Sequence, residues 1–286
     1  MKIKKMIFAT LCMFAMGSTA SAQSSEDTIK PVSAKGTILV VASSQPQMEM
    51  KDGSLRDIGF YLNELAVPSE YLADHNYRIV LATPSGKKPL MDAGSNDKKF
   101  FQNDDKTRAK AVQFVHNLPV ISLKDAVRQL NEYDALFIPG GHAPMADLMQ
   151  DPQLGIILRD FHTKDKPTAF ICHGTVAALA ALPDAAVYRK ALVSGDFPSA
   201  RKAAAGWIYQ GYHMTVFSDA EEWPGEVHSG IEMPFHVEPA LQIAGAHMHE
   251  GPLYQSNIVR DREAVTGQNP ASDIALAQEL LSMLKK

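Results

Sequence analysis

The sequence predicts an α/β fold, with a doubly wound and mainly parallel β-sheet covered by helices on both faces. Its strand-like segments are continuous apolar runs, the pattern of strands that are buried on both faces. Segments with apolar residues at helical spacing separate these runs, and parallel strands need such crossovers. The 286 residues are 45% hydrophobic and 21% charged, which excludes a disordered or collagen-like chain.

The N-terminus carries the three parts of a secretory signal peptide over residues 1–22. Lysines at positions 2, 4 and 5 precede an apolar run over residues 6–16, and the small residues Ala20-Ser21-Ala22 follow. The apolar run is shorter than the about 20 residues that a membrane-spanning helix needs. We therefore expect cleavage before Gln23 and a periplasmic protein without a membrane anchor. Cleavage would leave Cys172 as the only cysteine, which excludes a disulfide scaffold.

The first half of the chain contains two predicted strands. The polar residues 23–36 predict a flexible leader, and residues 37–286 contain no linker that would divide a single domain. Continuous apolar runs predict strands over residues 37–43 and 77–83. Apolar residues at helical spacing predict helices over residues 59–76, 106–116 and 123–130. Pro68 is expected to kink or restart the first helix, and the polar residues 87–105 to form a loop.

The second half continues the alternation of strands and helices. Apolar runs predict strands over residues 135–139, 168–172, 213–218 and 264–266. Helical spacing and small or apolar residues predict helices over residues 153–163, 173–182 and 273–284. Residues 223–250 are rich in His and Pro, and no element is assigned to them.

One segment combines a strand end with a nucleophilic residue. In Ala169-Phe170-Ile171-Cys172-His173-Gly174-Thr175 a buried strand runs directly into a helix of small residues. A sharp strand-to-helix turn exposes the side chain at its apex, as a nucleophile elbow does. The helix N-terminus and the adjacent His173 are both expected to lower the pKa of the Cys172 thiol and favour the thiolate. The alternative is a buried cysteine that acts as a small hydrophobic residue.

A second strand end carries Gly140-Gly141-His142, directly after the strand predicted over residues 135–139. Adjacent glycines let backbone N–H groups approach a ligand closely, as an oxyanion hole requires. Two glycines after a strand are also common turn chemistry. We favour the functional interpretation of this turn because the sequence also predicts a cysteine elbow at another strand end.

Two acidic segments are candidates for acid-base work. Glu64 is polar among apolar neighbours in the first predicted helix, although an exposed helical Glu is the ordinary alternative. Residues 218–222 (Ser-Asp-Ala-Glu-Glu) follow a predicted strand, so that one of their carboxylates could orient His173. The alternative there is a solvated acidic turn.

The histidines raise the question of a metal site. His247 and His249 would share one face of an extended segment, beside Glu250. Further histidines precede them at positions 213, 228 and 236. A zinc or copper site is conceivable, but this spacing matches no compact ligand motif. We therefore predict no metal and no cofactor. The formal net charge of −4 argues against a nucleic-acid partner.

Five segments are distinctive in combination: AFICHGTVAAL, DALFIPGGHAPMADL, GFYLNELAVP, TPSGKKPLMD and TGQNPAS. Together they resemble the ThiJ/PfpI family of the class I glutamine amidotransferase-like superfamily. The similarity extends from Thr37 to Leu284. It is strongest to a subgroup that contains glutathione-independent glyoxalases and stress chaperones of the heat-shock-thirty-one type.

The resemblance implies a flavodoxin-like fold, a homodimer and a catalytic role for several residues. It implies Cys172 as nucleophile, His173 as triad histidine, Glu64 as the acid beside the sulfur, and Gly140, Gly141, His142 and the His173 backbone around the oxyanion. Glu222 is the favoured triad acid, with Glu221 and Asp219 as fallbacks.

The same resemblance implies a cofactor-free enzyme that converts a 2-oxoaldehyde such as methylglyoxal into a 2-hydroxy acid. The alternatives are a hydrolase or deglycase that uses the same residues, and a non-catalytic envelope chaperone.

Overall fold

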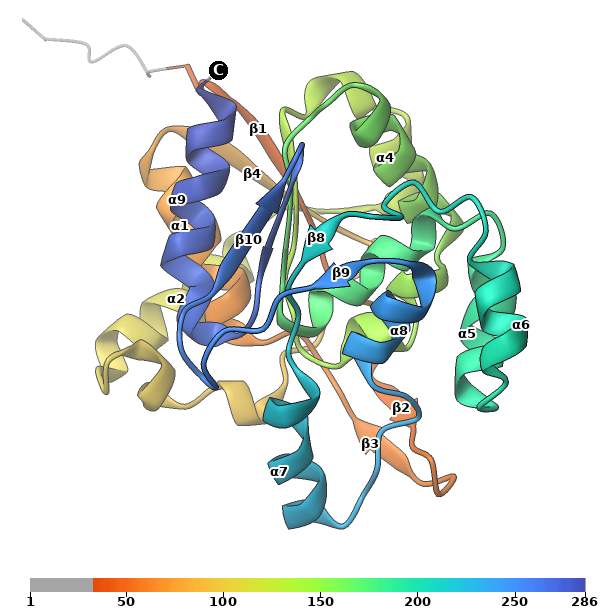
Figure 1. The fold of residues 1–286 in the computed structure, drawn as a ribbon. Helices are drawn as coiled ribbons and strands as arrows, with labels where there is room; N and C mark the ends of the chain where they lie inside the picture. Colours follow the sequence, from red (N-terminus) through yellow and green to blue (C-terminus); the bar gives the residue numbers. More distant parts are fainter. Residues whose placement is uncertain (1–32, 286) are drawn as a thin grey trace, which may run out of the picture. The chain divides into compact units, whose positions relative to one another are not determined.

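A seven-stranded sheet lies at the centre of the computed structural model, which describes residues 33–285 (Figure 1). The strand order is β10-β11-β7-β6-β1-β4-β5, and every neighbouring pair is parallel except β10 with β11. The predicted α/β class and mainly parallel sheet are therefore confirmed. The segments assigned to a signal peptide (1–22) and to most of the leader (23–36) lie outside the described residues.

The strands of this sheet are β1 (Gly36–Val41), β4 (Tyr77–Thr83), β5 (Val120–Ser122), β6 (Ala135–Ile138), β7 (Thr168–Ile171), β10 (Ile258–Asp261) and β11 (Ala264–Gly267). Two small sheets pair β2 (Gln47–Glu49) with β3 (Leu55–Asp57) and β8 (His213–Met214) with β9 (His247–Met248). The α-helices are α1 (Leu62–Asp74), α2 (Asp105–Asn117), α3 (Leu123–Val127), α4 (Pro152–Thr163), α5 (Ala185–Val193), α6 (Phe197–Ala203), α7 (Asp219–Ser229), α8 (Val237–Ala244) and α9 (Asp273–Leu284).

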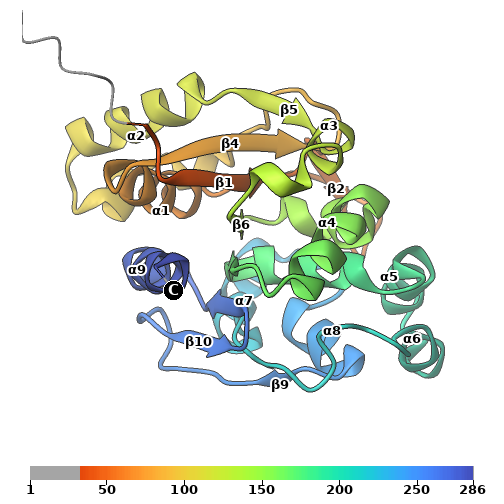
Figure 2. The same cartoon turned by 90° about the horizontal axis from the view of Figure 1, so that it is seen from above.

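Helices cover both faces of the sheet, and the strands supply buried side chains to each side. In β1, Ile38 and Val40 belong to the core cluster that contains residues of α1, α2 and α9, whereas Leu39 and Val41 belong to the cluster that contains residues of α3, α4 and α8. This alternation follows from the pleat of a strand, which turns successive side chains to opposite faces. Figures 1 and 2 both place α1, α2 and α9 together on one side of the sheet.

Several predicted elements differ from the structure. The helix expected over residues 59–76 is α1, which continues through Pro68 because its buried face packs against α2 and α9. The strand expected over residues 213–218 ends at Met214 and belongs to the small β8–β9 sheet. Its continuation leaves the ladder at Thr215, whose backbone N–H donates to the Thr266 hydroxyl at 2.8 Å. The helix expected over residues 173–182 is the 3₁₀ helix η6 (Cys172–Ala181).

Other elements of the structure were not predicted from the sequence patterns. The β2–β3 hairpin, β5, β10 and the helices α5, α6, α7 and α8 have no counterpart among the predicted elements. Short 3₁₀ turns, Ala93–Ser95 and Lys98–Phe101, interrupt the predicted loop over residues 87–105. Within residues 33–285, no helix has the length and apolar character that a bilayer crossing requires.

Candidate active site

The two strand-end turns meet at the carboxyl edge of the sheet. Strands β6 and β7 are parallel neighbours with Ile138 opposite Phe170, so that Gly140 comes to lie beside Cys172. Cys172 has φ of +57°, a left-handed conformation that is rare for a residue with a Cβ. Such strain is typical of a nucleophile elbow. The sequence pattern therefore predicted both the location and the sharpness of this turn.

The glycines of the second turn make room for the site. A Cβ on Gly140 would lie 2.4 Å from Glu64 Oε2 and 2.7 Å from Cys172 Cβ. Gly141 has φ of +89°, and a Cβ there would lie 2.2 Å from the Gly59 carbonyl oxygen. Both positions thus need glycine so that α1, β6 and the elbow can approach one another.

Cys172, His173 and Glu222 form a chain of polar contacts. The His173 Nδ1 lies 3.3 Å from Cys172 Sγ, and its Nε2 lies 2.5 Å from Glu222 Oε2. Cys172, His173 and Glu222 expose only 5%, 3% and 8% of their surfaces. The carboxylate fixes the proton of the imidazole on Nε2, which leaves Nδ1 as an acceptor for the thiol proton. This arrangement is that of a nucleophile, a base and an orienting acid.

The three acids of residues 218–222 have different partners. Glu222 meets His173, as favoured from the sequence. Glu221 instead accepts from Asn269 Nδ2 at 2.7 Å and closes a capping box with Ser218 at the start of α7. Asp219 pairs with His236, at 3.2 Å between Oδ1 and Nδ1. The alternative of a solvated acidic turn is wrong, because both glutamates are buried.

His142 also approaches Glu222, a role that the sequence did not suggest. Its Nε2 lies 3.6 Å from Glu222 Oε1, and its ring centroid lies 4.4 Å from that of His173. Burial lowers the pKa of His142, and the nearby His173 lowers it further. Burial opposes the ionised form of Glu222, but His173 and His142 hold the pKa of this carboxyl well below its usual range. Glu222 is therefore a carboxylate at neutral pH.

The residues of the expected oxyanion set act on different groups. The backbone N–H groups of His173 and Gly141 both stabilise negative charge on Cys172 Sγ. The N–H of Gly140 acts on the Glu64 carboxyl instead, and the His142 side chain lies against Glu222. A sequence pattern does not show where each N–H of a turn points, and the oxyanion roles of Gly140 and His142 stay predictions.

Glu64 is fully buried beside Cys172. Neither of its carboxyl oxygens has a hydrogen-bond partner of normal geometry within residues 33–285. Burial raises the pKa of Glu64 to about 8, although the Cys172 thiol and the Gly140 N–H act in the opposite direction. The carboxyl is therefore largely protonated at neutral pH, and the alternative of an exposed helical Glu is wrong. The site holds one neutral and one ionised carboxyl on opposite sides of the thiol–imidazole pair.

The thiol does not have the lowered pKa that we expected. Burial raises the pKa of Cys172 well above its ordinary value, and the neighbouring Glu64 raises it further. The N–H groups of His173 and Gly141 act against this rise. Burial and the second acid, Glu64, outweigh the helix end, from which the lowered pKa was expected. The thiol is therefore expected to lose its proton to His173 during attack.

A small cavity opens onto these residues. Its volume is about 190 Å³, below the about 300–1,000 Å³ of pockets for drug-sized ligands. Arg56, Tyr61 and Phe217 line it together with Cys172 and Glu222. Among the described lining residues Arg56 is the only Lys or Arg, and its guanidinium forms no hydrogen bond or ion pair with the described residues. Its charge reaches the site, since it lowers the pKa of His142.

Comparison with known proteins identifies the family. The model of the DJ-1/PfpI family matches residues 58–187. A curated protein from Bos taurus, glutamine amidotransferase-like class 1 domain-containing protein 1, is 30% identical over 213 residues, which cover 73% of this chain and 82% of that protein. The chain belongs to the DJ-1/PfpI family. This result confirms the resemblance seen in the sequence.

Other DJ-1/PfpI relatives extend the match. The protein/nucleic acid deglycase HchA of Pseudomonas aeruginosa is 24% identical over 242 residues, covering 82% of this chain and 75% of the relative. The Rapid Encystment Protein of Francisella tularensis matches with a TM-score of 0.65 and 25% identity, over 87% of this chain and 99% of that one. Glyoxalase III from Candida albicans matches with a TM-score of 0.62 and 20% identity, over 87% and 97%. The last of these shows the fold alone.

A second buried acid, Asp273, lies behind Glu64 and was missed. It begins α9, and Asn63 Nδ2 donates to its Oδ2 at 2.7 Å. Burial raises the pKa of Asp273 well above its ordinary value, and Glu64 raises it further. An Asp in the first turn of a helix is normal capping chemistry, so the sequence gave no signal for this role.

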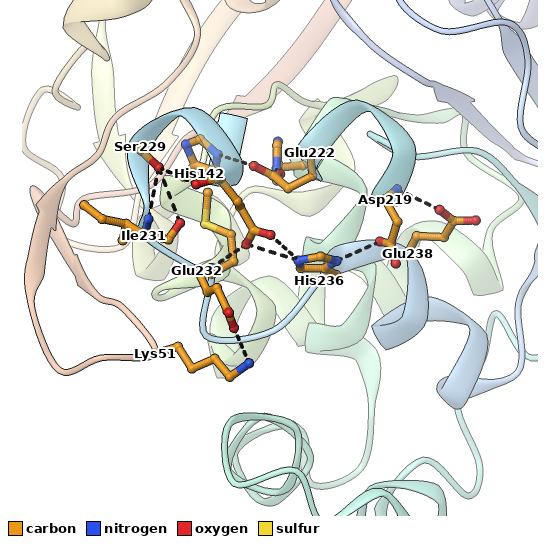
Figure 3. Close-up of polar contacts among 12 residues, drawn as sticks. Lys51, His142, Asp219, Glu222, Ser229, Ile231, Glu232, His236 and Glu238 are labelled. Carbon is orange, nitrogen blue, oxygen red and sulfur yellow. Dashed lines mark hydrogen bonds and ion pairs between the residues drawn. The ribbon is translucent and has the colours of Figure 1, made fainter. Parts of the chain in front are cut away.

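An ion-pair cluster holds the helix that carries Glu222. His236 lies between two acidic residues of α7, with Nδ1 3.2 Å from Asp219 and Nε2 3.1 Å from Glu226. Figure 3 shows the contact between His236 and Asp219. Asp219 is the first cause of a rise in the pKa of His236 to about 9, and Glu226 adds to it. His236 is thus charged at neutral pH and fixes α7 to the segment before α8.

The structure also shows which of the candidate metal ligands lie close together. His142, His173 and Glu222 offer ligand atoms within 4.8 Å of one another, within the part of the chain that is described. These atoms already contact each other in the site. Of the histidines in the last third of the chain, His213 on β8, His247 on β9 and His249 directly after β9 come together.

Proposed function

We propose that this DJ-1/PfpI protein is a cysteine-dependent enzyme of the glyoxalase type. It would convert a small 2-oxoaldehyde, with methylglyoxal as the model substrate, into a 2-hydroxy acid without a cofactor. The observation that carries the proposal is the pair of buried carboxyls in opposite states, Glu64 neutral beside the sulfur and Glu222 ionised behind His173. Carboxyls whose pKa values are pushed apart divide the acid and base roles of a reaction between them.

The first step forms a hemithioacetal. Cys172 Sγ attacks the aldehyde carbon, and the thiol proton moves to His173 Nδ1, which lies 3.3 Å away. The aldehyde oxygen then takes that proton from the imidazolium. The Gly141 and His173 N–H groups are aimed at this region and would stabilise the developing oxyanion.

The second step moves a proton between the two carbons. His173 removes the proton from the former aldehyde carbon, and Glu64 gives its proton to the ketone oxygen, which produces an enediol. Return of a proton to the second carbon, with loss of the hydroxyl proton from the first, gives a thioester on Cys172. Water then cleaves the thioester, so that methylglyoxal and water become lactate and the thiol is regenerated.

The cavity supports a small substrate whose product is an anion. Its volume of about 190 Å³ suits a few heavy atoms rather than a peptide. The product carries a carboxylate, and Arg56 is a cation that lines the cavity without a partner among the described residues. A guanidinium matches the geometry of a carboxylate with two parallel hydrogen bonds. Arg56 would therefore hold the product anion and favour the second half of the reaction.

The experiment that tests the proposal measures lactate from methylglyoxal by an enzyme-coupled assay. The parent protein should form lactate, and Cys172→Ala should form none while keeping the melting temperature of the parent. Glu70→Gln on the same helix is the matched control for Glu64→Gln. If the parent consumes no 2-oxoaldehyde, the proposal is wrong.

A deglycase is the second candidate, because curated relatives bear that name. The same cysteine would then act on an adduct between a 2-oxoaldehyde and an amine or thiol. Adducts of methylglyoxal with N-acetylcysteine and N-acetyllysine, supplied at a matched concentration of free methylglyoxal, separate the two functions. Turnover that depends only on free methylglyoxal supports the glyoxalase, and turnover that follows the adduct concentration supports the deglycase.

A further inference from the structure

Three exposed imidazoles gather on the β8–β9 sheet, on elements that are not part of the candidate active site. Strand pairing places His213 opposite His247, and His249 directly follows β9, two residues after His247. The ring centroid of His213 lies 5.2 Å from that of His247 and 4.7 Å from that of His249. All three side chains are exposed to solvent.

Two of the ring nitrogens converge directly. His213 Nδ1 lies 2.5 Å from His249 Nε2, so that one nitrogen must donate a proton to the other. Two protonated imidazoles could not share this contact, because both nitrogens would carry hydrogen. A cation that accepts both lone pairs would replace the shared proton.

The backbone holds both residues in place. The His213 N–H donates to Asp261 Oδ2 at 2.9 Å, and the His249 N–H donates to the Met214 carbonyl at 2.8 Å. The His249 carbonyl accepts from Asn257 Nδ2 at 3.0 Å. Because the backbone is held, the distance between the two ring nitrogens can change only by rotation of the imidazole rings. Two nitrogens that bind one tetrahedral zinc ion at about 2.0–2.1 Å lie about 3.3 Å apart. The distance between His213 Nδ1 and His249 Nε2, which is 2.5 Å, would therefore have to increase by less than about 1 Å.

We propose that His213, His249 and His247 form a binding site for a transition-metal dication of the zinc or copper class. Neutral imidazole is a preferred ligand of these ions, whereas magnesium and calcium prefer oxygen. His213 Nδ1 and His249 Nε2 are the first two ligands, and rotation of His247 supplies the third. The bound ion displaces the proton between the first two nitrogens, and the imidazole that donated it stays neutral by taking a proton from solvent on its other ring nitrogen.

The test is isothermal titration of the untagged, EDTA-stripped protein with zinc chloride, repeated with copper sulfate and with magnesium chloride. The parent should bind one equivalent of zinc at this site and no magnesium. His213→Ala and His249→Ala should each weaken zinc binding at least about tenfold, because loss of even an outer-shell partner costs that much. His116→Ala, which removes an exposed histidine of α2, is the matched control and should bind like the parent.

A second variant separates this site from the active-site histidines. If zinc binding is lost in His142→Ala and kept in His213→Ala and His249→Ala, the ion binds at the active site and the proposal is overturned. Unchanged affinity in His247→Ala would overturn the assignment of the third ligand. The melting temperature of the parent, but not of His249→Ala, should rise with zinc, because an ion that binds only the folded state stabilises it.

Discussion

Replacing Glu64 by Gln removes an ionisable proton from the core and leaves the shape of the side chain nearly unchanged. The carboxyl has its ordinary pKa of 4.5 when the chain is unfolded, and burial raises it to about 8 in the folded protein. The folded state therefore binds the proton more tightly, and the free energy of unfolding falls as the pH rises from about 4.5 through about 8. Each pKa unit corresponds to about 1.4 kcal/mol, so that the full loss comes to about 5 kcal/mol as an upper bound.

The assay is urea unfolding of the parent and of Glu64→Gln at pH 5, 7 and 9. The two proteins should differ little at pH 5, and Glu64→Gln should be the more stable at pH 9, because it carries no charge into the core. Glu70→Gln is the control on the same helix, where a surface pair with Lys110 is worth at most about 1 kcal/mol. Parallel curves for the parent and Glu64→Gln would refute the view that Glu64 is a buried, neutral acid.

Glu64→Gln should also change the reaction and the thiol. Turnover should fall about 100- to 10,000-fold, the ordinary cost of losing a general acid. The pKa of Cys172 should fall, because a nearby carboxylate no longer opposes the thiolate. Iodoacetamide alkylation across pH measures this change. A midpoint equal to that of the parent would contradict the pairing of the two groups.

Three further predictions concern the surroundings of the site. Gly140→Ala should lower the free energy of unfolding by about 1–3 kcal/mol through overpacking and should reduce turnover. Gly225→Ala is the control and should leave the free energy of unfolding unchanged, because a Cβ there meets nothing within 4 Å. Urea unfolding of both variants measures this, and equal stability would contradict the close approach at Gly140. Arg56→Gln should weaken inhibition by the 2-hydroxy acid product about 10- to 100-fold, which is the contribution of a hydrogen bond to a charged group. Arg56→Lys should retain part of the product inhibition. Unchanged product inhibition in Arg56→Gln would show that Arg56 does not bind the product. The free energy of unfolding should drop as pH rises through about 9, the pKa of His236, by about 1–2 kcal/mol after allowance for solvent screening. His236→Ala should lack this drop between pH 7 and pH 10 in urea melts, and a persistent drop would refute the role of this ion pair.

Local patterns predicted the parts of the fold that are local in origin. The strand over residues 77–83 and the helix over residues 273–284 have the predicted bounds, because an apolar run and a helical period are each written within one segment. The strand expected over residues 213–218 is short because Thr215 bonds to Thr266, a partner that is distant in sequence. Such contacts have no trace in a local pattern.

The candidate site likewise contains residues that the sequence predicted and residues that it did not. The elbow at Cys172 was predicted from its position after a strand, and Glu222 was favoured through the family resemblance. The role of His142, the buried Asp273 and the lining Arg56 depend on elements that meet only in the folded chain. The direction of the thiol pKa was wrong for the same reason, since it depends on burial and on the distant Glu64.

The most direct test of the proposed reaction is proton NMR of methylglyoxal incubated with the protein in D₂O. We expect lactate with deuterium at the second carbon, because the proton passes through exchangeable groups of His173 and Glu64. We expect no lactate with Cys172→Ala, and far less with Glu64→Gln than with Glu70→Gln. Lactate that retains the original hydrogen at the second carbon would contradict the proton transfer, and absence of lactate from the parent would contradict the proposed function itself.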